Sequence, residues 1–165
     1  GGYIYHAMAS SIDVRDIGLT VLSRGTPDVS VEITVLSRLG NGVPSTDLVD
    51  GVRAAVTAPN VKLLTDVVSV RPAQNIDYSV SATLNILPGP DPGMVKATSL
   101  ASLQKTADKY KRLAGGIPES AIIAALQAAL VDSVEDMTPA NGVSTTRWQF
   151  PNLVDTSLTV KVLGP

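Results

Sequence analysis

Cysteine is absent from this chain of 165 residues. Disulfide bonds, thiolate nucleophiles and thiolate metal ligands are therefore excluded. Histidine is nearly absent as well, because His6 is the only one. A lone histidine between apolar residues is more typical of a packed or surface side chain than of a general base, and it cannot build a metal site without partners. We interpret His6 as a structural residue.

Aromatic residues are also scarce, at 4% of the chain, although apolar residues make up 44%. The core must therefore be built from valine, leucine, isoleucine and alanine. Trp148 and Phe150 are two of the few large aromatic side chains, and they lie in an irregular, turn-rich tract. Two interpretations stay open for them: they anchor an interface with a partner, or they are buried against the sheet of the second half of the chain.

An excess of positive charge is missing too, since the formal net charge is −2. This balance gives no electrostatic argument for a nucleic acid or an anionic membrane as partner. Lys105, Lys109 and Arg112 are spaced to share one face of a predicted helix, but no predicted strand carries the paired aromatics that stack bases. We interpret them as a solvated face, with an acidic partner surface as the alternative. No apolar run approaches the ~20 residues that span a bilayer, so we expect no membrane partner.

Acidic pairs and glycine-containing loops are the remaining candidates for a metal-binding, phosphate-binding or catalytic site. The closest acidic pairs are Asp13/Asp16, Asp47/Asp50 and Glu135/Asp136, and none has the spacing of a calcium loop. We interpret the first two pairs as turn and helix N-terminal residues. The loops at 40–42 and 89–93 lack the Lys-Ser/Thr of a phosphate loop, and no Gly-x-Ser-x-Gly elbow occurs. We therefore expect no catalytic, cofactor-binding or metal-binding residue, and no enzyme.

Hydrophobic periodicity predicts helix–strand–strand–helix–strand for the first part of the chain. The expected ranges are 3–9, 14–22, 29–36, 45–58 and 62–70. The two consecutive strands should form a β-hairpin around Gly25 and Pro27. Ser45 is a suitable N-cap for the second helix. Pro72 cannot donate to a ladder, so it should end the last strand or lie on an edge.

The second part opens with strict alternation over 76–87, which predicts a half-buried antiparallel strand. The expected order is strand–helix–helix–strand–strand, with helices over 94–113 and 118–130 and strands over 131–137 and around 158–162. Gly115-Gly116 should stop the first of these helices, and Ala129 and Leu130 should belong to the buried face of the second. We predict an α+β fold of two small units, residues 1–72 and 73–165, each an antiparallel or mixed sheet with helices on one face.

Several of these segments, in this order, resemble the baseplate J-like proteins of contractile-tailed bacteriophages and related contractile injection systems. The most specific match is Leu64-Thr65-Asp66-x-Val68-x-Val70, followed some twenty residues later by Pro88-Gly89-Pro90. Leu113-x-Gly115-x-Ile117 continues the similarity. Pro118-Glu119 stands where the family tends to be basic, and 141–150 matches poorly. The resemblance covers nearly the whole chain as the C-terminal part of a longer member, so we expect a fragment.

The resemblance implies a structural protein of the tail baseplate, a part of the virion that is assembled in the host cytoplasm. Its partners would be other baseplate and tail proteins, and copies would associate within a ring of wedges around the central hub. The family offers no catalytic residues to carry over. Two alternatives from other classes remain: a nucleic-acid- or ligand-binding α+β module, and a hydrolytic enzyme.

Overall fold

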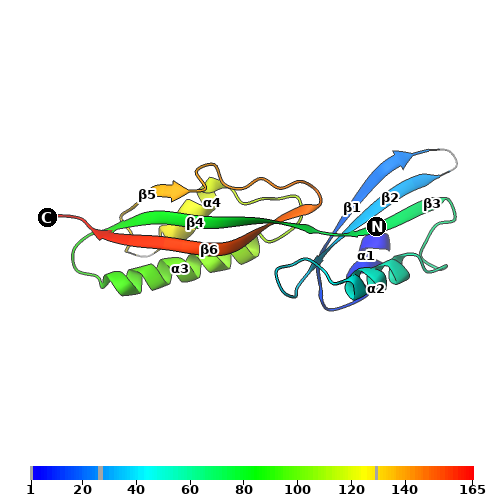
Figure 1. Ribbon diagram of the computed structural model, residues 1–165, viewed down its shortest axis with the longest axis horizontal. Coiled ribbons are helices and arrows are strands. Elements are labelled where there is room, and N and C mark those ends of the chain that lie inside the picture. Colours follow the sequence, from blue (N-terminus) through cyan, green and yellow to red (C-terminus); the bar gives the residue numbers. More distant parts are fainter. Residues whose placement is uncertain (1, 26–27, 129) are drawn as a thin grey trace. The chain divides into compact units, whose positions relative to one another are not determined.

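The computed structural model describes residues 2–25, 28–128 and 130–165, which form two three-stranded sheets and four helices (Figure 1). The elements are α1 (Gly2–Ala9), β1 (Val14–Arg24), β2 (Val29–Ser37), α2 (Thr46–Val56), β3 (Asp66–Pro72), β4 (Gln74–Ile86), α3 (Pro92–Lys109), α4 (Glu119–Leu126), β5 (Ser133–Thr138) and β6 (Gln149–Val162). Their order and type confirm the predicted α+β fold. The predicted roles of Pro27 and Ala129 lie outside the described residues.

The chain divides into two compact units, and neither is a single continuous segment. The first unit runs to Asn75 and adds Arg112–Ala114 and Thr146–Phe150. The second comprises Ile76–Lys111, Gly115–Thr145 and Pro151–Pro165. Two short segments that are distant in sequence therefore complete the first unit. The division into two domains at residue 72 stays a prediction.

In the first unit the sheet has the order β1-β2-β3. β1 and β2 are antiparallel, as the hairpin prediction required, and β3 runs parallel to β2. α1 and α2 contribute to one aliphatic core on one face of this sheet. The buried members of that core are Ala7, Val14, Ile17, Val31, Ile33, Val35, Val49, Val52, Val56 and Val70. Pro72 ends β3, an edge strand, which is where a residue without an amide hydrogen is tolerated.

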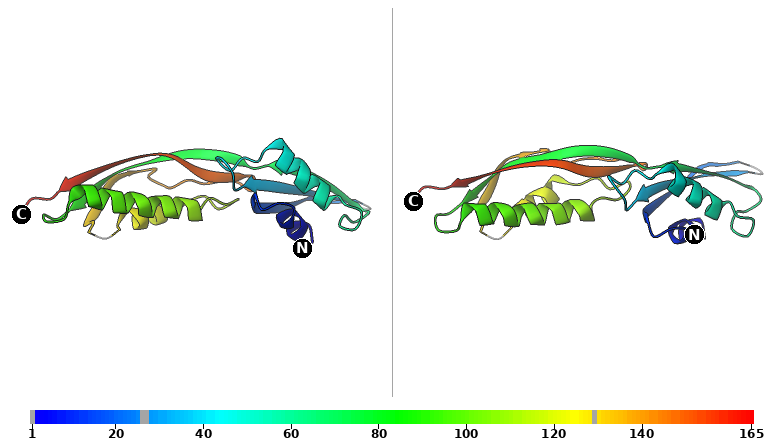
Figure 2. Two further views of the ribbon diagram at one scale, coloured as in Figure 1. Left: turned by 90° about the horizontal axis from the view of Figure 1, so that it is seen from below. Right: turned by 60° about the horizontal axis from the view of Figure 1, so that its bottom comes forward.

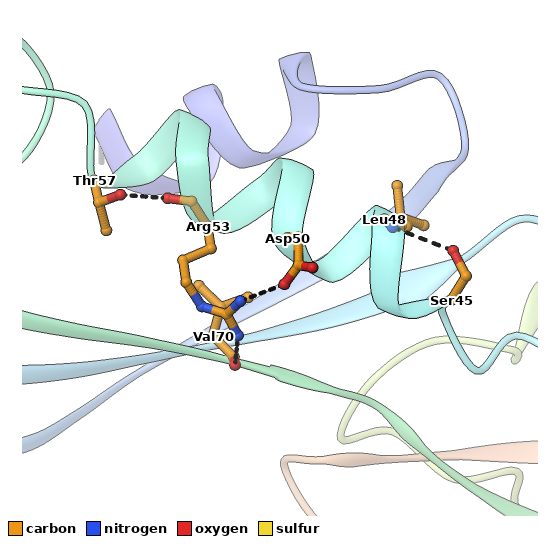
Figure 3. Close-up of polar contacts among 6 residues, drawn as sticks. All are labelled: Ser45, Leu48, Asp50, Arg53, Thr57 and Val70. Atoms are coloured by element: carbon orange, nitrogen blue, oxygen red, sulfur yellow. Dashed lines mark hydrogen bonds and ion pairs between the residues drawn. The ribbon is translucent and has the colours of Figure 1, made fainter.

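Helix α2 begins and ends on side-chain hydrogen bonds (Figure 3). Ser45 Oγ accepts a hydrogen bond from the amide of Leu48 at 3.2 Å, which confirms the predicted N-cap. At the other end, Thr57 Oγ1 donates to the carbonyl of Arg53 at 2.6 Å. The helix therefore stops at Val56, two residues before the predicted end at residue 58.

Two later segments of the chain, Arg112–Ala114 and Thr146–Phe150, cover the opposite face of the first sheet. Phe150 is fully buried and packs in a cluster with Leu36 and Ala73, with Leu113 against them. The open alternative of burial against the second half's sheet is therefore wrong for Phe150, whose buried contacts lie in the first unit. Gly42, at φ +106°, lies so close that a Cβ there would be 2.8 Å from the Phe150 ring.

In the second unit the sheet has the order β5-β4-β6, with β4 at its centre. The predicted alternation of β4 is confirmed, since Tyr78, Val80, Ala82 and Leu84 are buried in one cluster. β5 is antiparallel to β4, whereas β6 runs beside β4 in the same direction (Figure 1). The last described bond of that pair joins the amide of Leu163 to the carbonyl of Ile86 at 2.8 Å. The sheet is therefore mixed.

Helices α3 and α4 pack together on one face of this sheet (Figure 2). Ser99 on α3 is fully buried, and its hydroxyl donates to the carbonyl of Leu126 at the end of α4 at 2.9 Å. This bond satisfies a carbonyl that the helix leaves without an internal partner. Leu103, Ile122 and Leu126 fill the space between the helices and the sheet.

Besides the end of α2, four predicted boundaries are wrong. The last strand, expected around 158–162, begins at Gln149. α3 ends at Lys109, well before Gly115-Gly116, because Leu113 leaves the helical face and packs in the first unit. α4 ends at Leu126, and Leu130 is 65% exposed instead of buried. β3 begins at Asp66, so Leu63 and Leu64 precede the strand as exposed loop residues.

Candidate interaction surfaces

The residues considered as catalytic or metal-binding candidates either make structural contacts or are exposed. The His6 ring meets the Tyr5 ring edge-on at 5.3 Å between centroids. Asp16 accepts hydrogen bonds from the amides of Ile17 and Leu113, at 2.9 and 3.1 Å. Within the part of the chain that the structure describes, no three histidine or acidic side chains come together in a way that could hold a metal ion.

The remaining acidic pairs divide between a helix and a strand. Asp47 lies in the first turn of α2, where the helix dipole favours negative charge. Asp50 forms an ion pair with Arg53 at 2.6 Å on the exposed side of α2. Glu135 and Asp136 are exposed on β5, an edge strand. Asp47 and Asp50 thus lie at the start of the predicted helix, and Glu135 and Asp136 lie on the strand that was predicted over residues 131–137.

Arg53 also connects α2 to the edge of the first sheet (Figure 3). Its Nη1 holds Asp50, while its Nη2 donates to the carbonyl of Val70 on β3 at 3.3 Å. The side chain therefore occupies one of the backbone acceptors that an edge strand would otherwise offer to another strand. With Pro72 at the end of β3, this contact makes that edge a poor template for strand addition.

Trp148 forms the centre of a polar cluster on the first unit. Its Nε1 donates to Glu32 Oε1 at 2.5 Å. The guanidinium groups of Arg71 and Arg147 both lie over its ring, at 4.6 and 4.4 Å from the centroid. Arg71 Nη1 approaches Glu32 at 4.0 Å. Trp148 is half-buried against the first unit, so burial against the sheet of the second half is wrong for it, and its indole fixes the 146–150 segment to the sheet of the first unit. Its role as an interface anchor stays a prediction.

The prediction that Lys105, Lys109 and Arg112 share one helix face is wrong for Arg112. Lys105 and Lys109 are exposed on α3, and Lys109 lies 5.7 Å from the Tyr110 ring. Arg112 follows the end of the helix and belongs to the first unit. The three side chains therefore do not share a helix face.

A groove runs between α3 and β6 in the second unit. Its volume is about 340 Å³, and it is open along one side. It is lined by Gln104, Ala107, Asp108, Lys111 and residues 152–156. Within the second unit Asn152 Nδ2 donates to Asp77 Oδ1 at 2.9 Å and holds the start of this strand in place. The groove thus lies beside the first part of β6, the longest of the described strands.

Exposed apolar side chains gather on α1 and just after it. Ile4, Tyr5 and Met8 are between 37% and 70% exposed, and Ile12 is 89% exposed. Tyr3 on the same helix is engaged instead: its hydroxyl donates to Asp66 Oδ2 at 2.6 Å, and partial burial followed by this bond raises its pKa above 10.0. α1 is thus fastened to β3 while its other side stays open to solvent.

The sequence reasoning missed the main surface features because they join distant segments. The only local signal for the Trp148 cluster was the pair of large aromatics in a chain otherwise poor in them. The groove had no signal, since residues 149–153 do not alternate between apolar and polar. Among the described residues, none of the helices has the length and apolar character needed to cross a bilayer.

Comparison with known proteins identifies one informative relative. No protein-family model matches the chain. Baseplate protein J of Escherichia phage P2 is 37% identical over 139 residues, which make up 84% of this chain and 45% of that protein. The chain thus spans less than half the length of this relative and matches its C-terminal portion. This similarity confirms the resemblance that the sequence motifs indicated.

Proposed function

The chain is baseplate J-like, similar to the C-terminal portion of its relative, and we propose on this premise that it is a structural component of a phage tail baseplate. In this proposal it acts as part of a wedge, in a contractile tail or a related injection system. Its work is protein–protein assembly with other baseplate and tail proteins and with further copies of itself in a ring. It would reach the virion after assembly in the host cytoplasm.

The similarity to baseplate protein J is the observation that carries this proposal. The contacts of the polar residues support it, because they fasten structural segments to one another. Trp148 secures the 146–150 segment, Arg53 secures α2 to β3, and Ser99 joins α3 to α4. Such contacts give rigid units whose exposed surfaces are available for docking. Repeated contacts in a ring can sustain an assembly even where each interface is modest.

Labelling of particles tests the proposal. Gold-labelled antibody raised against the chain is applied to the tailed particles whose genome encodes it, and its position is recorded by electron microscopy. The proposal predicts label at the end of the tail distal to the head. Label on the head, or none on intact and disrupted particles alike, would exclude a baseplate component. Retention of the chain on immobilised nucleic acid, lost with rising salt, would instead favour the binding-module alternative.

A further inference from the structure

The outer face of the first sheet, opposite its aliphatic core, is covered only in part. The strand registers place three cross-strand rows of side chains on this face, and the residues between them belong to the core. The rows are Gly18–Thr34–Arg71, Thr20–Glu32–Ser69 and Ser23–Ser30–Val67. Segment 146–150 reaches the first two rows, because a Cβ at Gly18 would lie 3.6 Å from the Arg147 carbonyl oxygen. In the second row Glu32 accepts the hydrogen bond of Trp148.

The rest of this face, toward the end of the sheet where β1 finishes and β3 begins, carries no charged side chain in these rows. We call it the open shelf. It consists of small uncharged residues that are exposed or half-buried: Thr20, Ser23, Ser30, Val67 and Ser69. Val67 is 54% exposed although it is apolar. The centre of a protein–protein interface is depleted in charged residues, so the open shelf has the composition of such a centre.

An excess of positive charge borders the open shelf. The guanidinium groups of Arg71 and Arg147 both lie over the Trp148 ring, but Glu32 is the one carboxylate that contacts this stack among the described residues. Glu32 accepts the indole hydrogen bond and is 4.0 Å from Arg71 Nη1, which is longer than a hydrogen bond. Two positive groups on one ring therefore share a single negative group. A second anion beside the ring would balance them.

Both arginines keep donors that the described chain does not use. The Nε–H group of Arg71 is buried and has no hydrogen-bond partner among the described residues. Arg147 is exposed, and no acidic side chain in the described part of the chain forms an ion pair with it. Stacking on the indole restricts both guanidinium groups, so less rotamer freedom is lost when they bind a ligand. Their planar forks match the two oxygens of a carboxylate.

We propose that this face binds an acidic segment of another baseplate or tail protein. An aspartate or glutamate of that segment is bound by Arg147 and Arg71 beside Trp148, and its neighbours lie on the open shelf. Tryptophan and arginine are enriched among the residues that dominate binding energies at interfaces. Two arginines do not make the extended basic surface that binds a nucleic-acid backbone, so the charge fits a protein carboxylate. This inference deepens the proposed function and rests on it.

Photocross-linking in the particles tests the surface. The photoreactive amino acid p-benzoylphenylalanine replaces Val67 in the chain, and the irradiated particles whose genome encodes it are analysed by mass spectrometry. The cross-linked peptide should belong to another baseplate or tail protein and carry an acidic residue close to the linkage. The same replacement of Ala54, which is exposed on α2 on the core side of the sheet, is the control and should not yield that peptide. Cross-links only to a further copy of this chain, only to nucleic acid, or to nothing would overturn the proposal.

Charge reversal tests the arginines. Cross-link yield is measured in infected cells, where it does not depend on completed particles. Arg147→Glu should lower the yield from position 67 by roughly tenfold or more, because like charges then face each other. Arg38→Glu makes the same charge change at an exposed residue just beyond the other end of β2 and should leave the yield unchanged. Changing the acidic residue of the partner peptide to lysine should restore the yield of Arg147→Glu. An unchanged yield in Arg147→Glu, or no restoration, would overturn the proposal.

The outcomes for this surface and for the baseplate role are distinguishable. Gold label at the tail end together with no cross-link from position 67 to another tail protein would refute the acidic partner and leave the baseplate role in place. Wild-type chain that is absent from the particles would refute both.

Discussion

Trp148 Nε1 donates a hydrogen bond to Glu32 Oε1 at 2.5 Å across 116 positions of the sequence. The bond fixes a late segment of the chain to the central strand of the first sheet. The guanidinium groups over the same ring add cation–π attraction, which contributes roughly 0.5–1 kcal/mol each at exposed sites. The stability of the first unit thus depends on residues from the far end of the chain.

Removing this hydrogen bond should destabilise the first unit. Trp148→Phe keeps an aromatic ring but loses the donor, and we expect the free energy of unfolding to fall by about 1–3 kcal/mol. Glu32→Gln should cost less, because its amide oxygen still accepts. Denaturant unfolding of both single variants and the double variant measures the coupling. Strict additivity of the two effects would show that these side chains do not stabilise each other.

Gly42 is predicted to be irreplaceable because of Phe150. Gly42→Ala combines a positive φ with an overlap against the buried ring, so it should lower the free energy of unfolding by about 2–4 kcal/mol. Gly40→Ala is the matched control, since φ is also positive there but no atom lies within 4 Å of the added Cβ. It should cost only about 1 kcal/mol. Equal costs at the two positions would show that the contact with Phe150 is unimportant.

Tyr78 should make the protein sensitive to alkali. Burial raises the pKa of its hydroxyl from 10.0 to about 12. Below pH 10 the hydroxyl is protonated in both the folded and the unfolded state, so it does not make stability depend on pH there. As the pH rises further, the unfolded chain loses the proton first, so stability falls by roughly 1–3 kcal/mol up to the folded pKa. Denaturant titrations at pH 9 to 12 should show a shallower decline for Tyr78→Phe than for wild type.

At neutral pH Tyr78→Phe should not lower the free energy of unfolding. The Tyr78 hydroxyl is buried and has no hydrogen-bond partner among the described residues. Removing an unsatisfied polar group from the core leaves stability unchanged or raises it by up to about 1 kcal/mol. A large loss of stability in Tyr78→Phe would show that the hydroxyl has a bonding role.

Ser99 should contribute more to the stability of the fold than its small size suggests. Ser99→Ala removes the bond to the Leu126 carbonyl and leaves that acceptor without its partner, at a cost of about 1–2 kcal/mol. Thr98→Ala on the exposed side of the same helix is the control and should stay within about 0.5 kcal/mol of wild type. Thermal unfolding distinguishes them. Equal effects would mean that the buried hydroxyl does not join α3 to α4.

Elements could be predicted from the sequence where the signal lies within the element itself. The alternation of β4 survives in the structure because one face of that strand packs on helices and the other is polar. The N-cap of α2 was predictable because Ser45 acts on an amide three residues away.

Features that depend on distant partners were not predictable in the same way. Leu113 continues the helical spacing of α3, yet it packs with Leu36 and Phe150, and no local pattern records that preference. The start of β6 is hidden because Phe150, Pro151 and Asn152 are all buried in succession, which breaks the period of two. Trp148 and Phe150 could be flagged as unusual, but their partners could not be named. Tertiary contacts determine the conformation of these segments.

Cross-linking mass spectrometry on intact, purified tails tests the central claim most directly. Exposed lysines such as Lys105, Lys109 and Lys161 provide the reactive sites on this chain. If the chain works by packing within a baseplate, cross-links should join these lysines to other baseplate proteins. Cross-links confined to the chain itself, or leading only to head proteins, would contradict an assembly role in the baseplate.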